Sequence, residues 1–311
     1  MNVNAMNEGG DNMLELTGVT KRFGKQVAVD QISLTVKPGE ILGLIGQNGA
    51  GKTTTFRMIL DFLHPDSGTV QWQGQAMSKI DHDFIGYLPE ERGLYPKLSI
   101  VEQIEFFGQL HGMTRTAVRD ALPEWLERFE VKGKLTDKVK DLSKGNQQKV
   151  QLIAALIFMP KLVILDEPFS GLDPVNASLL EAGVRYLQTS GSAIIFSSHN
   201  MRNVESLSDR LVMLKNGAVV LAGTVGEIRA QYGETRISLT KPRLSADALA
   251  QLPGVLAVQG HGDEFELQLD DPERGQAIFQ TVTQGEYIAG FQQHAPSLDE
   301  IFRRKAGDEH A

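Results

Sequence analysis

The feature that most constrains the fold of this chain is GQNGAGKT, residues Gly46 to Thr53. It matches the pattern G-x-x-x-x-G-K-[ST], and it lies between an apolar run at 41–45 that suits a buried strand and a run at 53–63 that suits a helix. Glycines let successive backbone N–H groups turn toward one point, and the positive end of the following helix favours an anion there. A glycine-rich turn without a ligand is the alternative. The order of strand, loop and helix favours a nucleotide-phosphate site.

The side chains of this loop have separate expected tasks. Lys52 reaches the β- and γ-phosphates of the nucleotide, and the hydroxyl group of Thr53 binds Mg²⁺. The backbone amides of the loop hold the phosphates. The candidate nucleotide-binding residues in this stretch are Gly46, Asn48, Gly49, Ala50, Gly51, Lys52, Thr53 and Thr54.

The charge and cysteine content of the chain restrict its partners. The sequence has 31 Lys and Arg against 39 Asp and Glu, a net charge of −8, which argues against broad electrostatic binding to nucleic acid or to an anionic membrane. It has no cysteine, so it forms no disulfide or thiolate metal site, and the cytosol is the simplest compartment. No stretch reaches the roughly 20 apolar residues that span a bilayer, so we expect action at a membrane to require a partner. Residues 1–12 lack the regions of a signal peptide and are expected to form a disordered tail.

Two further apolar runs end in residues that suit phosphate chemistry. The four apolar residues at 162–165 indicate a strand buried on both faces, and Asp166 and Glu167 follow it. The run at 193–198 indicates another buried strand and ends at His199. The carboxyl ends of central strands are where an α/β sheet places its ligand chemistry, and Mg²⁺ needs a carboxylate near the phosphate loop. Two surface acids and a structural histidine are the alternatives.

The remaining pattern indicates the domain organisation. Alternating residues at 13–36 predict an antiparallel β-subdomain, and the capping box Ser99-x-x-Glu102 opens a helical insert at about 91–140. In the last part of the chain the order β-α-β-β-α-β is typical of a ferredoxin-like unit. We therefore predict an α/β fold with a P-loop NTPase core, a mostly parallel sheet with helices, at 13–223. A small α+β domain follows at 224–311.

Five motifs in this order resemble the ATP-binding subunit of ATP-binding-cassette (ABC) transporters, over about residues 14–223. They are the phosphate loop, Glu90 after Tyr87-Leu88-Pro89, LSKGN at 142–146, LVILDEP at 162–168 with SGLD at 170–173, and His199. Each motif is short, but the ordered set is highly specific. GYLPEERGLYP at 86–96 and PSLDEIFRRKAG at 296–307 resemble a narrower group, the bacterial exporter ATPases of the sodium-extrusion and drug-resistance type with a short extra C-terminal domain.

The resemblance implies a role for each site residue in ATP hydrolysis. Glu167 is the general base that holds the attacking water, and His199 senses the γ-phosphate. Phe23, which the local sequence leaves open between an adenine platform and ordinary edge packing, stacks on the adenine. The implied catalytic residues are Lys52, Glu167 and His199, and the implied Mg²⁺ ligands are Thr53, Glu90 and Asp166. Glu90 stands where the family usually has Gln, which adds negative charge near the γ-phosphate.

LSKGN corresponds to the loop that this family usually writes LSGGQ, its signature loop. Lys144 and Asn146 replace the first Gly and the Gln, and Ser143 and Gly145 are kept. The loop follows Lys52 by 91 positions (143 − 52), across the whole helical insert. The resemblance implies that it closes on the ATP of a second copy in a head-to-tail dimer with two composite sites. The residues expected at this interface are Ser143, Gly145, Asn146 and, at the seam, Asp173.

The resemblance also implies the partners. They are a second copy or a homologous cassette, and a separate transmembrane permease that holds this chain at the cytoplasmic face of the membrane. Nucleic acid is not expected. The alternatives are the ATPase subunit of an importer, a soluble ABC ATPase that acts on ribosomes or DNA, and a nucleotide kinase or GTPase. The soluble ABC ATPase is disfavoured, because the chain has a single cassette, no long heptad run and an acidic balance. The nucleotide kinase or GTPase is disfavoured because LSKGN has no role in such enzymes. The transported substrate stays open.

Overall fold

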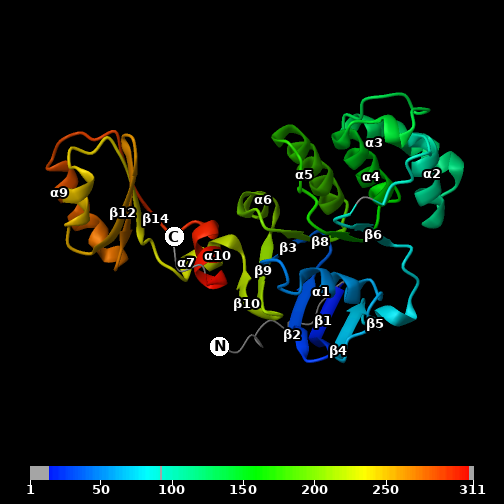
Figure 1. Ribbon diagram of the computed structural model, residues 1–311, viewed down its shortest axis with the longest axis horizontal. Coiled ribbons are helices and arrows are strands. Elements are labelled where there is room, and N and C mark those ends of the chain that lie inside the picture. Colours follow the sequence, from blue (N-terminus) through cyan, green and yellow to red (C-terminus); the bar gives the residue numbers. More distant parts are fainter. Residues whose placement is uncertain (1–13, 92, 308–311) are drawn as a thin grey trace. The chain divides into compact units, whose positions relative to one another are not determined.

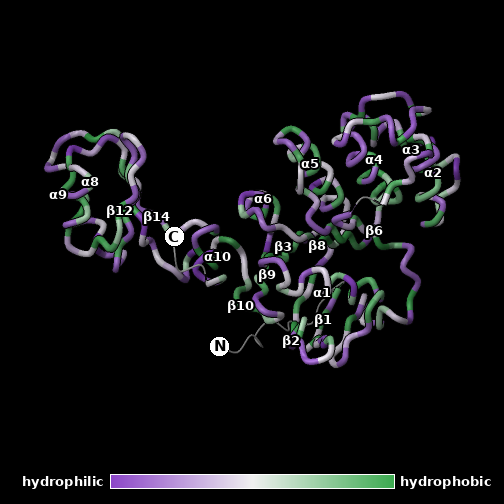
Figure 2. Tube along the Cα trace, viewed as in Figure 1, coloured by the Kyte–Doolittle hydropathy of each residue, from purple (hydrophilic) through white to green (hydrophobic). Residues whose placement is uncertain are grey.

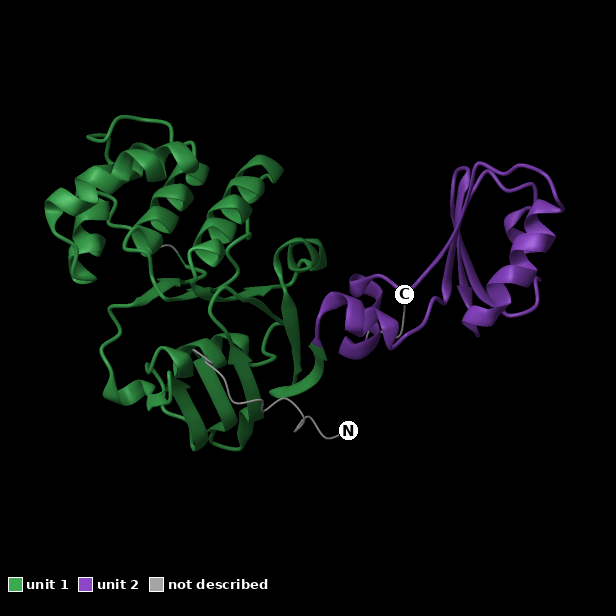
Figure 3. Ribbon diagram, turned by 180° about the vertical axis from the view of Figure 1, so that it is seen from behind, with its two compact units in different colours: residues 1–222 green, residues 223–311 purple. Residues whose placement is uncertain are grey.

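The computed structural model describes residues 14–91 and 93–307, so the tail expected at 1–12 lies outside the described residues. The chain divides into two compact units between Ala222 and Gly223 (Figure 3). Each unit has a hydrophobic core of its own. Among the described residues, no helix is both long and apolar enough to cross a membrane.

A six-stranded sheet forms the centre of the first unit, with the strand order β10-β9-β3-β8-β7-β6 (Figure 1). Neighbouring strands from β9 to β6 pair in parallel, which confirms the predicted, mostly parallel sheet. β3, β7 and β8 consist entirely of buried residues, and Figure 2 shows this part of the chain as hydrophobic, because other layers cover both faces. The strands are β3 (Ile41–Ile45), β6 (Ile85–Leu88), β7 (Leu162–Leu165), β8 (Ala193–Ser198), β9 (Arg210–Lys215) and β10 (Ala218–Gly223).

Helix α1 (Lys52–Ile59) lies between this sheet and a second, antiparallel sheet with the order β2-β1-β4-β5 (Figure 1). One core cluster contains residues of α1 and of both sheets. α1 is shorter than the predicted run to residue 63, because Asp61 has a positive φ of 56° and ends the helical path. The remaining elements of this layer are β1 (Leu14–Phe23), β2 (Gln26–Val36), β4 (Ser67–Trp72), β5 (Gln75–Ala76) and the 3₁₀ turn η1 (Met77–Lys79).

Helices cover the opposite face of the six-stranded sheet (Figure 1). The predicted capping box is present, since the hydroxyl of Ser99 accepts the N–H of Glu102 and the carboxylate of Glu102 accepts the N–H of Ser99. It opens the helical insert, which packs on α4 and precedes β7. These elements are α2 (Ile100–Leu110), α3 (Arg115–Arg128), η2 (Val139–Asp141), α4 (Lys144–Leu156), α5 (Pro174–Thr189) and α6 (Met201–Leu207).

The second unit is a four-stranded antiparallel sheet with the order β12-β13-β11-β14, which confirms the predicted ferredoxin-like unit. The first strand of the unit lies between its third and fourth strands, and the two helices lie on one face (Figure 3). The elements are β11 (Arg236–Thr240), α8 (Ala246–Ala250), β12 (Val255–His261), β13 (Glu264–Leu269), η3 (Pro272–Arg274), α9 (Gly275–Thr283) and β14 (Gly290–His294).

Two more helices, α7 (Val225–Ala230) and α10 (Leu298–Ala306), belong to the second unit. The guanidinium of Arg236, a residue 5% exposed, donates to Oε1 of Glu300 at 2.7 Å and ties α10 to the start of β11. Burial raises the pKa of Glu300, but the N–H of Ser297 and the charge of Arg236 outweigh it, so the pKa lies below its usual value. The pair is therefore intact at neutral pH, and its contribution to stability is lost as the pH falls through this lowered pKa.

The contact between α5 and the helical insert provides a test of the packing. Gly183 of α5 faces Phe129, and a Cβ on it would overlap the ring of Phe129, which is 1% exposed. We expect Gly183→Ala to lower the free energy of unfolding by about 1–3 kcal/mol, because the buried ring has no room to move. Calorimetric unfolding measures this. Gly226→Ala in α7, where a Cβ meets nothing within 4 Å, is the control and should be neutral or slightly stabilising. An unchanged Gly183→Ala protein would contradict the packing.

Candidate nucleotide-binding site

The phosphate loop connects the carboxyl end of β3 to the first residue of α1, as predicted. Gly46 has a φ of 156°, and a Cβ on it would lie 2.6 Å from the carbonyl oxygen of Leu214. Gly51, the N-cap of α1 with a φ of 108°, would place a Cβ 2.6 Å from the carbonyl oxygen of Ala28. Neither position has room for a side chain. Because no side chain caps α1, its first N–H groups remain available to an anion.

A hairpin far along the sequence supports this loop. The N–H of Gly217, in the turn between β9 and β10, donates to the carbonyl oxygen of Ala50 at 3.1 Å. The carbonyl oxygen of Gly217 accepts the N–H of Asp30 at 2.8 Å, and a Cβ on Gly217 would lie 2.8 Å from the carbonyl oxygen of Ala28. The turn therefore fits between the loop and β2. The Asn-Gly pair predicts a tight turn, but nothing in the sequence predicted this contact.

Lys52 lies inside the loop and is 7% exposed. Its Nζ donates to the carbonyl oxygen of Gly46 at 2.7 Å and lies 3.4 Å from that of Gln47. The same Nζ is 3.9 Å from Oε1 of Glu167. The ammonium group is thus positioned at the point toward which the loop turns, and it is paired with the predicted catalytic carboxylate.

Thr53 and Asp166, two of the three predicted Mg²⁺ ligands, are in contact. The hydroxyl of Thr53 donates to Oδ2 of Asp166 at 3.1 Å, and Asp166 is 3% exposed. Both side chains offer the hard oxygen atoms that Mg²⁺ prefers, and Mg²⁺ at phosphate sites commonly takes one or two protein ligands, with phosphate oxygens and water completing its shell. The pair fits that ion. Within residues 14–91 and 93–307 no group of three or more His, Cys, Asp or Glu could hold a metal.

The third predicted ligand, Glu90, is not joined to them. It is exposed, two residues past the end of β6, and forms no hydrogen bond or ion pair with another described residue. The N–H of Asp166 donates to the carbonyl oxygen of Leu88 at 2.8 Å, so Glu90 follows the strand next to Asp166, at the same edge of the sheet. Phe23 ends β1 and is 52% exposed, which leaves its ring free to act as a platform.

Glu167 and His199 lie together, as expected for the predicted base and sensor. Nδ1 of His199 is 2.9 Å from Oε2 of Glu167, a hydrogen bond when the proton is on Nδ1. The side chain of Glu167 is 10% exposed and that of His199 is 68% exposed. Glu167 has a φ of 50°, the left-handed region that non-glycine residues seldom adopt. The backbone turns sharply after Asp166, which directs the two neighbouring carboxylates to different partners.

Ser197 also belongs to this site, although the sequence analysis did not single it out. Its hydroxyl donates to Oδ1 of Asp166 at 2.7 Å and accepts the N–H of Glu167 at 2.8 Å. Ser197 is completely buried on β8, the strand beside β7. The one available signal is its place two residues before His199, at the end of a strand that begins with four apolar residues.

The signature residues, which the resemblance names a loop, lie at the start of helix α4. Ser143 is the N-cap of α4, its hydroxyl accepting the N–H of Asn146, so Gly145 and Asn146 lie in the first helical turn. The side-chain amide of Asn146 bonds both the N–H and the carbonyl oxygen of Lys132, at 3.4 and 3.0 Å. The side-chain amide of Asn146 is therefore hydrogen-bonded to the helical insert of the same chain. Ser143 and Lys144 are exposed.

Asp173 lies beside the start of α4, the helix that carries the signature residues. It is the N-cap of α5, and its carboxylate accepts the backbone N–H and the side-chain amide of Asn176 at 2.9 and 2.7 Å. A Cβ on Gly145 would lie 3.2 Å from that same amide nitrogen. The starts of α4 and α5 therefore adjoin on one surface. No hydrogen bond or ion pair joins Ser143, Gly145 or Asp173 to the phosphate loop within the described residues.

A cavity of about 380 Å³ lies between the helical insert and the end of α1, and we call it the insert groove. Most of its lining is apolar, including Phe62, Tyr87, Phe107 and Ala155. Phe62 is 70% exposed at the groove, with its ring edge-on to Tyr87 at 6.3 Å. Burial, and after it the negative charge of Asp166, raise the pKa of Tyr87. Tyr87 therefore lines the groove while experiencing the field of the predicted metal ligand.

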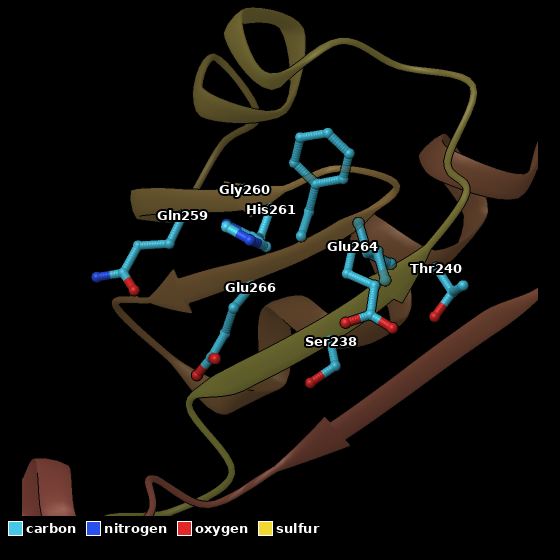
Figure 4. Close-up of a pocket in the computed structure, with 9 residues that line it drawn as sticks. Ser238, Thr240, Gln259, Gly260, His261, Glu264 and Glu266 are labelled. Carbon is cyan, nitrogen blue, oxygen red and sulfur yellow. The ribbon is translucent and has the colours of Figure 1, made fainter.

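The second unit has a shallower cavity of about 450 Å³ on its sheet, lined by side chains of β11, β12 and β13 (Figure 4). Figure 4 shows polar groups around it, among them Ser238, Thr240 and Glu266. His261 and Glu264 there are exposed, and the hydroxyl of Ser238 lies 2.8 Å from Nε2 of His294 on β14.

Comparisons with known proteins agree with the geometry. A family model described as "ABC transporter" matches residues 29–170, and one described as the C-terminal domain of DrrA1-3-like ATP-binding proteins matches residues 223–306. The uncharacterized ABC transporter ATP-binding protein YhaQ of Bacillus subtilis is 42% identical over 298 residues, which are 95% of this chain and 99% of YhaQ. The Nod factor export ATP-binding protein I of Ralstonia nicotianae is 31% identical over 307 residues, covering 97% of this chain and 96% of that protein.

A solved structure gives the same result for the fold. An ATP-binding subunit of an ABC transporter matches with a TM-score of 0.67 at 30% identity, over 71% of this chain and 93% of the other. The resemblance that the motifs carry, and the P-loop NTPase fold expected from it, are confirmed.

Proposed function

The chain belongs to the family of ABC transporter ATP-binding subunits, which bind and hydrolyse ATP with Mg²⁺, and we propose from this that it drives an exporter. Proteins of this family dimerise and act with membrane permeases. Export rather than import is supported by the Nod factor export protein that is similar along almost the whole chain. We place the chain at the cytoplasmic face of the membrane, bound to a separate permease.

The observation that supports the catalytic assignment best is that five predicted residues converge at the carboxyl edge of one sheet. They are Lys52, Thr53, Asp166, Glu167 and His199. Lys52 leaves its contact with Glu167 for the β- and γ-phosphates, which frees the carboxylate. Glu167 then takes a proton from the attacking water as oxygen joins the γ-phosphorus and the bond to ADP breaks, and His199 orients both. Thr53 and Asp166 hold the Mg²⁺, which neutralises charge on the phosphates.

The phosphate loop and the residues around it make up only half of the proposed ATP site; a second copy of the chain supplies the other half. Ser143, Gly145 and Asp173 have no bond to the phosphate loop of the described chain, yet they lie on one surface at the starts of α4 and α5. In a head-to-tail dimer this surface closes on the ATP held by the second copy, and two-fold symmetry makes two such sites. Ser143 and Gly145 carry the contact. We assign Asn146 a structural role instead, because its side-chain amide is hydrogen-bonded to the backbone of Lys132.

The insert groove is the proposed docking site for the permease. Its apolar lining, with the exposed ring of Phe62, suits an apolar helix of the partner. Tyr87 lines the groove and precedes Leu88, whose carbonyl oxygen accepts the N–H of Asp166 at 2.8 Å, so movement in the groove has a short path to the metal ligands. Glu90, three residues after Tyr87, lies on that path.

Phe62→Ser is expected to weaken binding of the permease by roughly 30-fold, or about 2 kcal/mol, because an exposed aromatic anchor is lost from the groove. The chain is co-expressed with a candidate permease, and co-purification and permease-stimulated ATPase activity are measured. Hydrolysis without the permease should stay at the level of the parent protein.

Tyr287→Ser is the matched control, since it removes a ring that is 87% exposed on the second unit. It should leave permease binding unchanged. If Phe62→Ser binds and is stimulated as the parent protein is, the groove is not the docking site. If the parent chain neither co-purifies with a membrane protein nor is stimulated by one, the exporter proposal fails.

A further inference from the structure

We propose that Ser197 is a positioning residue for ATP hydrolysis, one hydroxyl that orients the metal ligand and the general base together. The inference rests on the proposed roles of Asp166 and Glu167. The hydroxyl hydrogen of Ser197 goes to Oδ1 of Asp166, and its oxygen receives the N–H of Glu167, at 2.7 and 2.8 Å. Ser197 is 0% exposed, so water cannot replace either bond.

The first bond distinguishes the two oxygens of Asp166. Oδ1 is engaged by Ser197, and Oδ2 faces the hydroxyl of Thr53 at 3.1 Å. A carboxylate held at one oxygen cannot rotate freely, so Oδ2 stays directed at the position where the metal and its water would lie. Groups that bond to a metal ligand in this way orient it and raise metal affinity.

The second bond supports the unusual backbone of Glu167. The N–H of Asp166 still pairs with the carbonyl oxygen of Leu88 on β6, whereas the N–H of Glu167 turns to β8 and reaches Ser197. With its φ of 50°, Glu167 is in a conformation that persists only when its surroundings hold it. This turn directs the side chain of Glu167 to His199 and Lys52.

The neighbouring Ser198 supplies a matched control. It is 1% exposed on the same strand, but its hydroxyl accepts the N–H of Asn200 at 3.0 Å and has no bond to Asp166 or Glu167. Ser197→Ala and Ser198→Ala remove the same atom from equally buried positions one residue apart. A difference between them measures what the contacts of Ser197 do, beyond the loss of one buried hydroxyl.

The test uses the full chain with ATP and Mg²⁺. Ser197→Ala is expected to need roughly 10–100-fold more Mg²⁺ for half-maximal hydrolysis, and to have a lower kcat at saturating Mg²⁺, with KM for ATP within about twofold of the parent value. Ser197→Cys, which is slightly larger and keeps a weak donor at the same position, should shift in the same direction by a smaller factor. Ser198→Ala should match the parent protein in its Mg²⁺ requirement.

Equal Mg²⁺ curves and equal kcat for Ser197→Ala and Ser198→Ala would overturn the proposal, as would a loss in Ser197→Ala confined to KM for ATP. If Ser197→Ala does not fold, the Mg²⁺ curve of Ser197→Cys decides. Glu167→Gln, measured beside them, separates this inference from the proposed function. An inactive Glu167→Gln with a normal Ser197→Ala rejects only the role of Ser197. An active Glu167→Gln rejects the assigned base itself.

Discussion

Replacing Glu167 with Gln is expected to slow ATP hydrolysis by about 10²–10⁴-fold, because an amide cannot take the proton of the attacking water. This corresponds to roughly 3–5 kcal/mol in the barrier. Gln has the size of Glu and can still lie beside His199, so the site should keep its shape. ATP binding is expected to survive. The ATP-bound dimer should therefore accumulate, since the step that separates the two copies has been removed.

Phosphate release and size-exclusion chromatography with ATP and Mg²⁺ measure the two effects. Glu124→Gln on α3 is the control, because Glu124 is an exposed glutamate whose contact is an ion pair with Arg128. It should hydrolyse ATP at the rate of the parent protein. Hydrolysis at the parent rate by Glu167→Gln would show that another group is the base. A monomer that binds ATP but does not associate would contradict the head-to-tail dimer.

The ends of the buried strands were the most predictable part of this site. Asp166 and His199 follow runs of apolar residues, and parallel strands bring their carboxyl ends to one edge of a sheet. Their sequence positions therefore predicted that both lie at the same edge of the sheet, where His199 contacts Glu167. The phosphate loop was predictable for a related reason, since Gly46 and Gly51 occupy positions where no side chain fits. The topology of the second unit was predicted from its element order, β-α-β-β-α-β, which is typical of a ferredoxin-like unit.

Contacts that depend on which strands are neighbours could not be predicted. Ser197 and Ser198 are identical residues at the end of one strand, and only the alternation of that strand and its place beside β7 decide which hydroxyl reaches Asp166. The turn at Gly217 reads as an ordinary hairpin in the sequence. Its bond to Ala50 arises because β9 pairs with β3, although the two strands are far apart in the sequence.

The helical start of the signature motif was not predicted from the sequence. Gly145 and Asn146 are poor helix formers. In the structure the hydroxyl of Ser143 caps α4, and the side chain of Asn146 is bonded to the backbone of Lys132. Gln148, one turn later, donates to the carbonyl oxygen of Pro168 at 3.2 Å. These tertiary contacts outweigh propensity, and they attach the exposed end of α4 to the strand that carries Glu167.

Replacing Lys52 with Ala is expected to weaken ATP binding by roughly 100-fold, about 3 kcal/mol, because a buried cation aimed at the phosphates is lost. Lys52→Ala therefore lowers the affinity for ATP, whereas Glu167→Gln lowers the rate of hydrolysis. A second cause also weakens ATP binding in Lys52→Ala. In the parent protein Nζ of Lys52 lies 3.9 Å from Oε1 of Glu167, so the variant leaves that carboxylate, 10% exposed, without its cation as the phosphates approach.

Titration with a fluorescent ATP analogue measures the affinity, and Lys149→Ala is the matched control. Lys149 is also buried, at 9% exposed, but its Nζ donates to the carbonyl oxygen of Glu130 in the helical insert. Its removal should leave the affinity of a single copy for ATP unchanged. If the two variants bind equally well, Lys52 does not reach the phosphates. The unpaired carboxylate of Glu167 can be tested separately from the lost cation. The double variant Lys52→Ala/Glu167→Gln should bind ATP more tightly than Lys52→Ala, because the uncompensated negative charge is then gone.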